Sequence, residues 1–198
     1  EFLAVNQVTV KGTHTRRPDV VVFVNGLPLA VIELKNVSDA RTTIEQAFNQ
    51  LQTYMRQIPA LFHTNELLVI SDGVLTEIGT ITSGRERFAT WKTIDGDILD
   101  HKGSLETAIR GIFEPRRFLD LIRHFIVFED DGKKVVKKVA QYHQFHAVQK
   151  AVTTALQATG TDGDGKGGVL WHTQGSGKSL TMLFFAGKLV RQAALKNP

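Results

Sequence analysis

The sequence contains no cysteine among its 198 residues. It can therefore form no disulfide framework and no zinc site built on thiolates. It also lacks any apolar run that approaches the ~20 residues of a membrane-spanning helix, and no leader segment is visible. These absences predict a soluble, cytoplasmic protein with no membrane partner. Hydrophobic residues make up 42% and charged residues 22% of the chain, which predicts a folded core.

Acidic residues are scarce in the last third of the chain, and none follows Asp164. Residues 1–131 hold 14 basic and 18 acidic residues, whereas residues 132–198 hold 10 basic and 2 acidic residues. The basic part includes the run Lys133-Lys134-Val-Val-Lys137-Lys138. Two interpretations stay open: a surface that binds a polyanion such as DNA or RNA, or a solvated linker whose balancing acids lie elsewhere in the protein.

A phosphate-binding loop is predicted near the end of the sequence, at His172-Thr-Gln-Gly-Ser-Gly-Lys-Ser179. An apolar segment at 168–171, expected to be a strand, precedes it, and an apolar helix is expected at 180–190. In such loops backbone N–H groups point at the phosphates of a nucleotide, the lysine reaches the β and γ oxygens, and the serine hydroxyl can ligate Mg²⁺. The candidate ATP-binding residues are Thr173, Gly175, Ser176, Gly177, Lys178 and Ser179.

The loop departs from the strict pattern at its first position, where the chain has His172 in place of glycine. Helicase-like ATPases of superfamily two often relax that position, so the loop resembles theirs. The alternative is a glycine-rich turn with a surface lysine. A motor of this kind also needs a second carboxylate to hold the metal and orient water, and none follows the loop. We therefore expect a piece of a longer protein that carries only the opening of an ATPase domain.

The first half of the chain predicts a β-hairpin followed by a helix. Residues 19–24 and 29–35 are strand-like runs joined by the turn signal Asn25-Gly26, with Pro28 inside the turn. A helix is expected at about 39–57. Further predicted elements are a strand at 67–71, one or two strands within 74–94, a helix opened by Ser104, a second helix from Pro115 to about 125, and a helix at 143–158.

Three charged residues of this hairpin are candidates for catalysis. Glu33 and Lys35 lie two apart on the return strand, so their side chains project from one face. Asp19 opens the first strand, and the hairpin brings it near the far end of the strand that carries Glu33. Charges that interrupt an apolar strand are unusual unless they are paired or functional.

These residue types suit the hydrolysis of phosphodiesters. Asp19 and Glu33 can hold Mg²⁺ through carboxylate oxygens, together with water and a substrate phosphate. A bound metal lowers the pKa of its water, and Lys35 beside it can orient and stabilise the attacking hydroxide. The alternative is the exposed end of a hairpin that bears a solvated Glu/Lys pair.

Gln50 and Tyr54 lie four residues apart on the predicted helix and so share one face. Alone, this pair is an ordinary helix surface. Together with Arg17-Pro18-Asp19 and Glu33-Leu34-Lys35, however, it resembles the Q-x-x-x-Y branch of the PD-(D/E)xK nucleases, the branch similar to the RecB nuclease domain. The resemblance implies that Gln50 and Tyr54 support the catalytic site and contact DNA.

Such a nuclease followed by a superfamily-two motor is similar to the restriction and translocation subunit (R, or HsdR) of type I restriction enzymes. Residues 115–128 resemble the family's connection between nuclease and motor. Residues 142–147 resemble the glutamine element before the ATP loop, which makes Gln144 a candidate reader of adenine; the alternative is a plain polar position at a helix start. His143 and His146 have no third ligand, so we interpret them as surface or linker residues.

The resemblance implies an α/β fold with a PD-(D/E)xK-type mixed sheet flanked by helices, followed by the start of a RecA-like ATPase domain. We expect the nuclease domain at 1–130, a basic connection at 131–142 and the ATPase opening at 143–198. The resemblance also implies Mg²⁺- and ATP-dependent cleavage of double-stranded DNA away from a recognition site. The implied partners are modification (methyltransferase) and specificity subunits, which use AdoMet. Two alternatives stay open: another nuclease–helicase of DNA processing or repair, or an inactive nuclease-like clamp that positions DNA.

Overall fold

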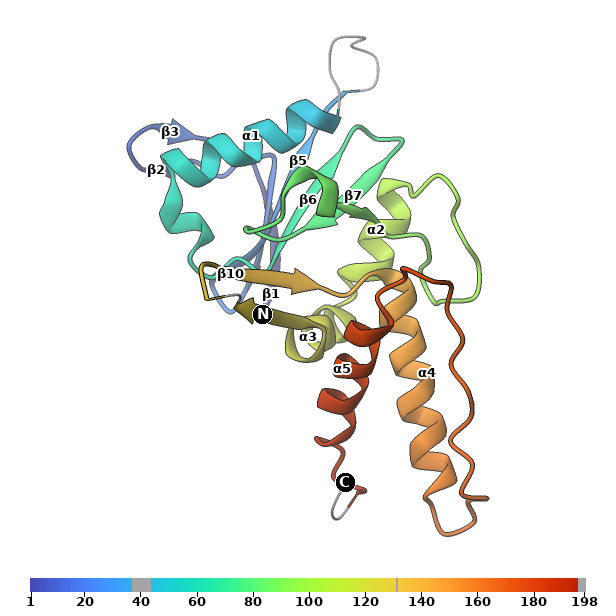
Figure 1. Cartoon of the computed structure of the whole chain (residues 1–198). Coiled ribbons are helices and arrows are strands. Elements are labelled where there is room, and N and C mark those ends of the chain that lie inside the picture. Colours follow the sequence, from blue (N-terminus) through green and yellow to red (C-terminus); the bar gives the residue numbers. More distant parts are fainter. Residues whose placement is uncertain (37–43, 131, 196–198) are drawn as a thin grey trace.

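The computed structural model describes residues 1–36, 44–130 and 132–195 of the chain. Its central sheet is built from β1 (Phe2–Asn6), β4 (Val20–Val24), β5 (Leu27–Leu34), β6 (Leu67–Ser71), β7 (Thr76–Gly79) and β8 (Ala89–Thr90). The strands lie in the order β1-β4-β5-β6-β7-β8 (Figure 1). Strands β5 and β6 pair in parallel and the other neighbours pair antiparallel, so the sheet is mixed.

Helices pack on both faces of this sheet. The described helices are α1 (Ile44–Gln57), α2 (Leu105–Ile112), α3 (Pro115–His124), α4 (Tyr142–Ala158) and α5 (Lys178–Leu189), with short 3-10 turns η1 (Pro59–Phe62) and η2 (Arg85–Arg87). One face packs against α1, which buries Leu51 and Tyr54 with Val31 and Ile70 of the strands. The opposite face packs against α2, α3 and α4. The predicted mixed sheet flanked by helices is therefore confirmed. None of the helices in the described ranges is long and apolar enough to cross a membrane.

The unit β5–α1–β6 decides which side chains face α1. Parallel neighbouring strands require a crossover connection, and α1 provides it on one face of the sheet. Side chains alternate along β5, so Ala30 and Ile32 enter the core beneath α2 and α3, whereas Val31 packs on the α1 side. Glu33 follows the parity of Val31 and therefore faces α1.

The predicted hairpin is confirmed as β4 and β5, but the position of Pro28 was wrong. Pro28 belongs to β5 and pairs with Phe23, where the register between the two strands shifts. A proline cannot donate to the ladder and is tolerated at such an irregularity. The predicted helix is confirmed as α1 from Ile44 onward, and its expected first residues, 39–43, lie outside the described residues.

The elements predicted in the middle of the chain are also confirmed. Strand β6 has the predicted bounds, and two short strands, β7 and β8, follow. Ser104 caps α2 by accepting a hydrogen bond from the Thr107 backbone N–H at 3.2 Å. Pro115 opens α3 at a position where its missing N–H costs nothing, and Glu114 caps this helix.

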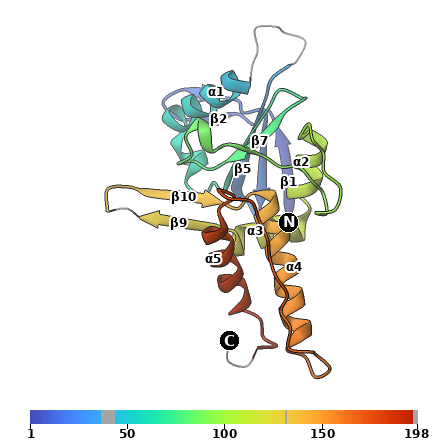
Figure 2. The same cartoon turned by 45° about the vertical axis from the view of Figure 1, so that its right-hand side comes forward.

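Half of the lysine run, expected to be part of a basic connection, lies in a strand: Lys137 and Lys138 belong to it, whereas Lys133 and Lys134 precede it. Strands β9 (Ile126–Asp130) and β10 (Val135–Val139) pair as a hairpin at one side of the molecule (Figure 2). Lys137 is buried, donates to the Asn65 carbonyl at 2.7 Å and forms an ion pair with Glu66. The solvated-linker interpretation is therefore wrong for Lys137, whereas for the exposed Lys133 and Lys134 both interpretations stay predictions. Lys137 cannot reach an external polyanion, because burial and two partners hold it inside.

A hairpin of two short strands, β2 (Val10–Lys11) and β3 (Thr15–Arg16), lies beside the end of α1. The Thr13 hydroxyl donates to the Gln57 carbonyl at 3.0 Å, and the Arg16 side chain donates to the Gln57 side chain. These contacts attach the segment between β1 and β4 to the helix that covers the sheet.

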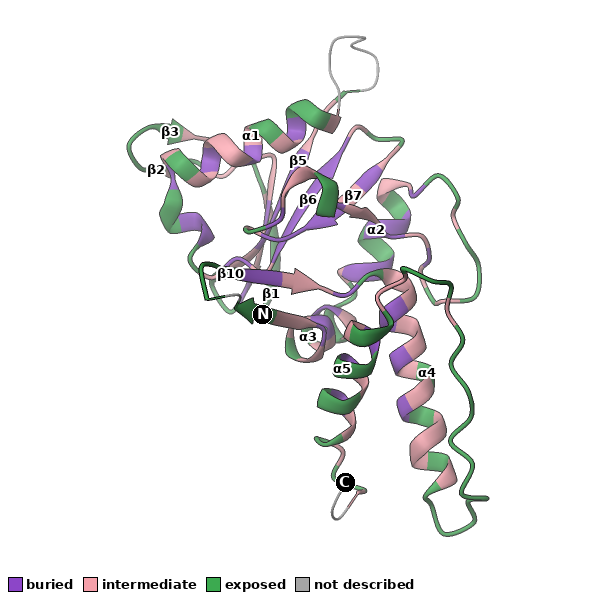
Figure 3. Cartoon of the chain, viewed as in Figure 1, coloured by how far each residue is buried: buried purple, intermediate pink, exposed green. Residues whose placement is uncertain are grey.

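Helices α4 and α5 lie side by side and extend away from the sheet (Figures 1 and 2). Their bases belong to the same core as the sheet. The ring centroid of Phe125 lies 4.6 Å from that of Phe145 on α4 and 5.7 Å from that of Phe184 on α5. The hydrophobic core is therefore continuous from the sheet to both helices, whereas residues 159–171 are exposed (Figure 3).

The strand expected at 168–171 is absent, which corrects that prediction. These residues are extended but belong to no sheet, and the Val169 and Trp171 side chains are 98% and 82% exposed. A strand needs a hydrogen-bonded neighbour, and no described strand runs beside this segment. The helix predicted after the loop is confirmed as α5, which begins at Lys178.

A buried polar cluster ties α5 to α3 and α4. The Lys188 ammonium of α5 donates to the Asp120 carboxylate of α3 at 2.7 Å and to the Gln149 side chain of α4 at 2.8 Å. The same ammonium lies 5.2 Å from the ring centroid of Phe125. Lys188 is 8% exposed, so its charge depends on these partners.

We expect the substitution Asp120→Asn to destabilise the protein by about 2–3 kcal/mol, because it leaves a buried cation without its counter-charge. The measurement is the unfolding midpoint in urea. The double variant Asp120→Asn/Lys188→Met should recover most of the loss, since methionine fills the site beside Phe125 without a charge. An equal loss in the single and double variants would contradict this explanation.

Candidate functional site

The residues predicted for phosphodiester chemistry lie together at one end of the β4–β5 pair. Val20 is paired with Ile32, so the next residues of this antiparallel register, Asp19 and Glu33, lie opposite each other. Asp19 lies two residues before Val21 and Glu33 two residues after Val31, so both side chains face α1 as those valines do. Lys35 comes two residues after Glu33 and therefore lies on the same side. The structure therefore brings Asp19, Glu33 and Lys35 to one side of the sheet, as predicted.

Hydrogen bonds fix the three side chains. The Asp19 carboxylate accepts a hydrogen bond from the Leu34 backbone N–H at 2.8 Å, which ties the start of β4 to the end of β5. The Lys35 ammonium donates to Glu33 Oε1 at 2.7 Å. The Lys35 backbone N–H donates to the Ser71 carbonyl at 2.8 Å, which holds this residue against the end of β6.

Glu33 is 2% exposed, and this burial dominates its electrostatics. Burial raises the pKa of the Glu33 carboxyl above its ordinary value, the Lys35 ammonium opposes the rise, and the Asp19 carboxylate adds to it. Glu33 Oε2 is buried and has no partner at hydrogen-bond distance among the described residues, and the Tyr54 hydroxyl is close enough to the carboxylate to lower its pKa. A buried carboxylate oxygen without a partner is a costly arrangement unless a cation or a donor occupies the site.

The helix α1 places Gln50 and Tyr54 over the same site. Tyr54 is buried, which raises the pKa of its hydroxyl to about 12, and the nearby Glu33 carboxylate contributes to the rise. Gln50 interacts with the same hydroxyl. The two residues predicted to support the catalytic carboxylate therefore lie beside it. A tyrosine with this pKa stays protonated near neutral pH and can act as a hydrogen-bond donor.

A shallow groove passes beside Lys35 along the outer side of α1. Its volume is about 440 Å³, and it is lined by Lys35, Gln46, Asn49, Gln50 and Thr53. The four helix residues occur at the spacing of one helical face. An extended ligand in this groove would contact polar side chains and reach the Lys35 ammonium.

The donor set of this site fits Mg²⁺. No group of three or more His, Asp or Glu side chains in the described parts of the chain is placed to hold a metal ion. Asp19 and Glu33 together provide two carboxylates, one of which has the unpartnered oxygen Oε2. Mg²⁺ keeps several waters and commonly binds through one or two carboxylates plus substrate phosphate. These two hard oxygen donors, one of them paired with the groove residue Lys35, therefore meet its requirements.

One residue at this site escaped the sequence analysis. The Gln7 side chain, at the end of β1, donates to Asp19 Oδ1 at 2.9 Å. No motif marks Gln7 in the sequence, because the contact depends on the pairing of β1 with β4. A glutamine directly after a predicted strand is too common to point to a site.

The second predicted site is the loop before α5, and its backbone has features expected of a phosphate-binding loop. Gly175 and Gly177 have positive φ values of 80° and 75°, a conformation that glycine adopts without strain. Gly177 caps the 12-residue helix α5, whose N-terminal N–H groups face the loop. The Lys178 ammonium donates to the carbonyls of His172 and Thr173, at 3.3 and 3.0 Å. Thr173 supplies one of these carbonyls and Ser179 is the second residue of α5, and the roles of Thr173, Ser176 and Ser179 in binding ATP stay predictions.

Gln144 supports the loop from α4. Its side-chain amide donates to the Gly177 carbonyl at 3.1 Å, and its Oε1 accepts a hydrogen bond from the Gln141 backbone N–H at 2.9 Å. Gln144 is 3% exposed and closes the capping box at the start of α4, so it has the helix-start position of the alternative and also contacts the loop. Its role as a reader of adenine stays a prediction. A Cβ atom at position 177 would lie 2.6 Å from this amide, which is a second reason for glycine there.

The interpretation of His143 and His146 as surface or linker residues was wrong. The His143 ring lies 3.0 Å from the Ser176 carbonyl and packs edge-on against His172, with centroids 5.2 Å apart. His146 packs against Trp91 at 6.0 Å, and its burial lowers the pKa of the imidazole to about 4. Both histidines therefore pack against residues outside α4. Their spacing in the sequence gives no sign of this, because each contact crosses from α4 to a distant segment.

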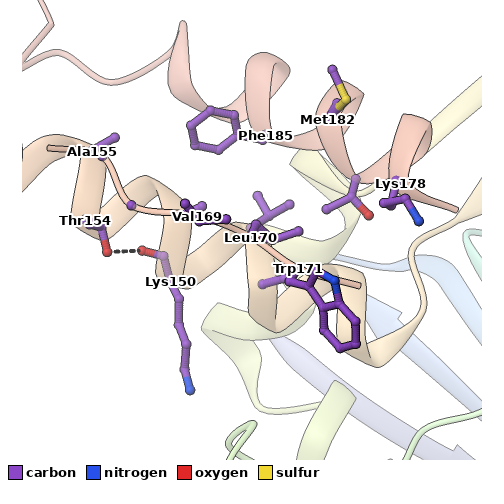
Figure 4. Close-up of a pocket in the computed structure, with 15 residues that line it drawn as sticks. Lys150, Thr154, Ala155, Val169, Leu170, Trp171, Lys178, Met182 and Phe185 are labelled. Atoms are coloured by element: carbon purple, nitrogen blue, oxygen red, sulfur yellow. Dashed lines mark hydrogen bonds between the residues drawn. The ribbon is translucent and has the colours of Figure 1, made fainter. Parts of the chain in front are cut away.

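A cavity of about 660 Å³ adjoins the loop before α5. It lies between α4, the extended residues 167–171 and α5, and Lys178 and Thr181 are at its edge (Figure 4). Val169, Leu170, Met182 and Phe185 make its lining mainly apolar (Figure 4). The cavity is far from the Asp19–Glu33 site in the chain and shares no lining residue with the groove beside α1.

Comparison with known protein families identifies the family of this chain. The type I restriction enzyme R protein N-terminal family matches residues 1–87, and the SWI2/SNF2 ATPase family matches residues 143–198. Over its whole length the chain is 45% identical to the HindI type I restriction enzyme endonuclease subunit of Haemophilus influenzae. The chain belongs to the type I restriction enzyme R protein family.

A second R protein relative is the putative MjaIXP type I restriction enzyme endonuclease subunit of Methanocaldococcus jannaschii, 35% identical over the whole chain. A third, from Staphylococcus aureus, is 31% identical over 97% of the chain. The chain spans 19%, 21% and 20% of these three relatives, about a fifth of their length. The family resemblance inferred from the motifs is therefore confirmed, and it extends through both candidate sites.

Proposed function

We propose that this R protein chain carries the DNA-cleaving site and the opening of the ATP-driven motor of a type I restriction endonuclease. The observation that supports the cleavage site is the convergence of Asp19, Glu33 and Lys35 at one end of the β4–β5 pair, beneath Gln50 and Tyr54 of α1. This is the arrangement expected of a PD-(D/E)xK nuclease of the Q-x-x-x-Y branch. The relatives named as endonuclease subunits support the same function.

In this proposal Asp19 and Glu33 hold Mg²⁺ through their carboxylate oxygens. When bound, Mg²⁺ supplies a water of lowered pKa and neutralises negative charge on the scissile phosphate. Lys35, held 2.7 Å from Glu33, orients the attacking water and stabilises charge that develops during attack. Tyr54 positions the Glu33 carboxylate, Gln50 positions the Tyr54 hydroxyl, and Gln50 also lines the groove in which the DNA backbone would lie.

The motor part rests on the loop before α5. Gly175 and Gly177 give the loop its positive φ angles, and the loop and the helix N-terminus would offer backbone N–H groups to the phosphates of ATP. The Lys178 ammonium would exchange its contacts with loop carbonyls for the β and γ phosphates, and the Ser179 hydroxyl would face the Mg²⁺ that accompanies ATP. Gln144 and His143 of α4 contact the carbonyls of Gly177 and Ser176 and so stabilise the loop.

The proposed partners follow from the family. Double-stranded DNA is the substrate, and modification and specificity subunits, which use AdoMet, would select the site in a cytoplasmic complex. ATP hydrolysis would drive translocation along DNA before cleavage away from the recognition site. Since the chain covers about a fifth of its relatives, these activities belong to the complete protein.

The test is cleavage of an unmethylated supercoiled plasmid by the full-length protein assembled with its modification and specificity subunits. We expect cleavage with ATP and Mg²⁺, none after EDTA removes the metal, and full recovery when Mg²⁺ is restored. A plasmid methylated by the same system is the matched control and should stay uncut. DNA binding without any Mg²⁺-dependent cleavage would contradict the nuclease proposal and favour an inactive clamp.

A further inference from the structure

Gln7 has an unusual backbone conformation. Among the described residues, the non-glycine positions with positive φ are Gln7, at 53°, and Asn25, at 49°. Asn25 lies in the Asn-Gly turn of the β4–β5 hairpin, where this conformation is normal. Glutamine is not favoured there, and no such turn surrounds Gln7. Strained residues of this kind persist where the surrounding structure requires them, and they cluster at functional sites.

The contacts of Gln7 lead to Asp19. Its backbone N–H donates to the Asp19 carbonyl at 2.9 Å, and its side-chain amide donates to Asp19 Oδ1 at 2.9 Å. The Leu34 backbone N–H donates to the other carboxylate oxygen, Oδ2, at 2.8 Å. Both oxygens of the candidate metal ligand are therefore held by donors, one of them from Gln7.

The pairing of β1 with β4 explains how Gln7 reaches this position. Asn6 is paired with Val20, so Gln7 lies opposite Asp19 in the same register. At Gln7 the chain leaves the sheet toward β2, and the positive φ makes this turn while the backbone bond to Asp19 remains. The turn and the side-chain contact occur in the same residue.

We propose that Gln7 is a positioning residue, whose side-chain amide fixes the orientation of the Asp19 carboxylate toward Glu33 for Mg²⁺ binding. The inference rests on the proposed role of Asp19 as a metal ligand. A carboxylate oxygen has two lone pairs, so Asp19 Oδ1 can accept from Gln7 and still offer an electron pair to a cation. Partners that orient a metal ligand in this way typically contribute roughly 10–100-fold in metal affinity or activity.

Two variants separate positioning from a purely structural role. Gln7→Gly removes the amide and relieves the positive φ. Gln7→Asn tolerates this backbone conformation, but its shorter side chain holds the amide too far from Asp19. Asn25→Gly is the matched control, because it changes the other non-glycine residue with positive φ among the described residues without touching the site. Asp19→Asn tests the metal ligand itself.

The measurement is Mg²⁺ affinity by titration calorimetry of the full-length protein, without DNA and without nucleotide. The absence of nucleotide leaves the phosphate-binding loop without the phosphates that would hold a cation there. Unfolding midpoints and the Mg²⁺ concentration for half-maximal plasmid cleavage are measured on the same samples.

We expect Gln7→Gly and Gln7→Asn each to weaken Mg²⁺ binding roughly 10-fold, with unfolding midpoints equal to or above wild type, and Asn25→Gly to bind like wild type. If both Gln7 variants bind Mg²⁺ like wild type while Asp19→Asn does not, the positioning role is wrong and the nuclease site stands. If Asp19→Asn also binds like wild type, the metal site is wrong and the role of Gln7 falls with it.

Discussion

Replacing Glu33 by glutamine should abolish DNA cleavage while the protein stays folded and continues to hydrolyse ATP. Glu33 is buried, and its Oε2 has no hydrogen-bond partner among the described residues, so the side chain is available to a cation. Glutamine keeps the shape of the side chain but removes its charge, and an amide is a poor ligand for Mg²⁺ beside a single remaining carboxylate. We expect a loss of roughly 10³-fold or more in the rate of plasmid linearisation.

The matched control for this prediction is Glu77→Gln. Glu77 lies on β7 in the same row of the sheet, because Ile70 pairs with both Glu33 and Glu77. Like Glu33, it is a carboxylate with a pKa raised by burial, and it has one cationic partner, Arg85, at 2.7 Å. If Glu77→Gln cuts like wild type and Glu33→Gln does not, the loss belongs to the site and not to burial of a carboxylate. If Glu33→Gln cuts DNA efficiently, Asp19 and Glu33 do not form the cleavage site and this part of the proposal is wrong.

Lys35→Ala distinguishes two roles of the lysine at this site. If Lys35 acts in the reaction, its removal lowers the cleavage rate even at saturating Mg²⁺. If it only neutralises Glu33, the variant should bind Mg²⁺ at least as tightly as wild type and keep cutting, because the competing ammonium is gone. The proposed mechanism requires the first result.

Local pattern was sufficient to predict that the residues of the candidate nuclease site lie together. Asp19, Glu33 and Lys35 lie on two strands joined by a tight turn, so strand alternation and hairpin geometry place them without further information. Gln50 and Tyr54 follow from helical spacing in the next element. The phosphate-binding loop is equally local, since its glycines, Lys178 and Ser179 are consecutive.

Contacts between distant segments could not be predicted in this way. Gln7 reaches Asp19 because β1 pairs with β4, and Lys137 is buried because β10 carries it to Asn65 and Glu66. In the sequence the first is an ordinary polar residue and the second is part of a basic run. The segment 168–171 shows the opposite error: its composition suits a strand, but strand formation depends on a neighbour that the described chain does not place beside it.

Replacing Lys178 by alanine should lower the rate of ATP hydrolysis roughly 100-fold or more. DNA cleavage should be lost as well, because in the proposed mechanism it depends on translocation. Lys178 is exposed, and its ammonium contacts only the carbonyls of His172 and Thr173 among the described residues. Its loss should therefore cost little stability, and Mg²⁺ binding at Asp19 and Glu33 should stay unchanged. The measurements are phosphate release in the presence of unmethylated DNA and plasmid cleavage by the same protein.

Lys166→Ala is the control for this lysine. Lys166 is an exposed lysine in the glycine-rich segment shortly before the loop, so it represents the alternative of a surface lysine on a glycine-rich turn. We expect it to leave ATP hydrolysis unchanged. If Lys178→Ala also hydrolyses ATP like wild type, the loop is such a turn and the proposed motor site is wrong. If Lys178→Ala stops ATP hydrolysis but plasmid cleavage continues, the nuclease works without the motor, and the proposed dependence of cleavage on translocation is wrong.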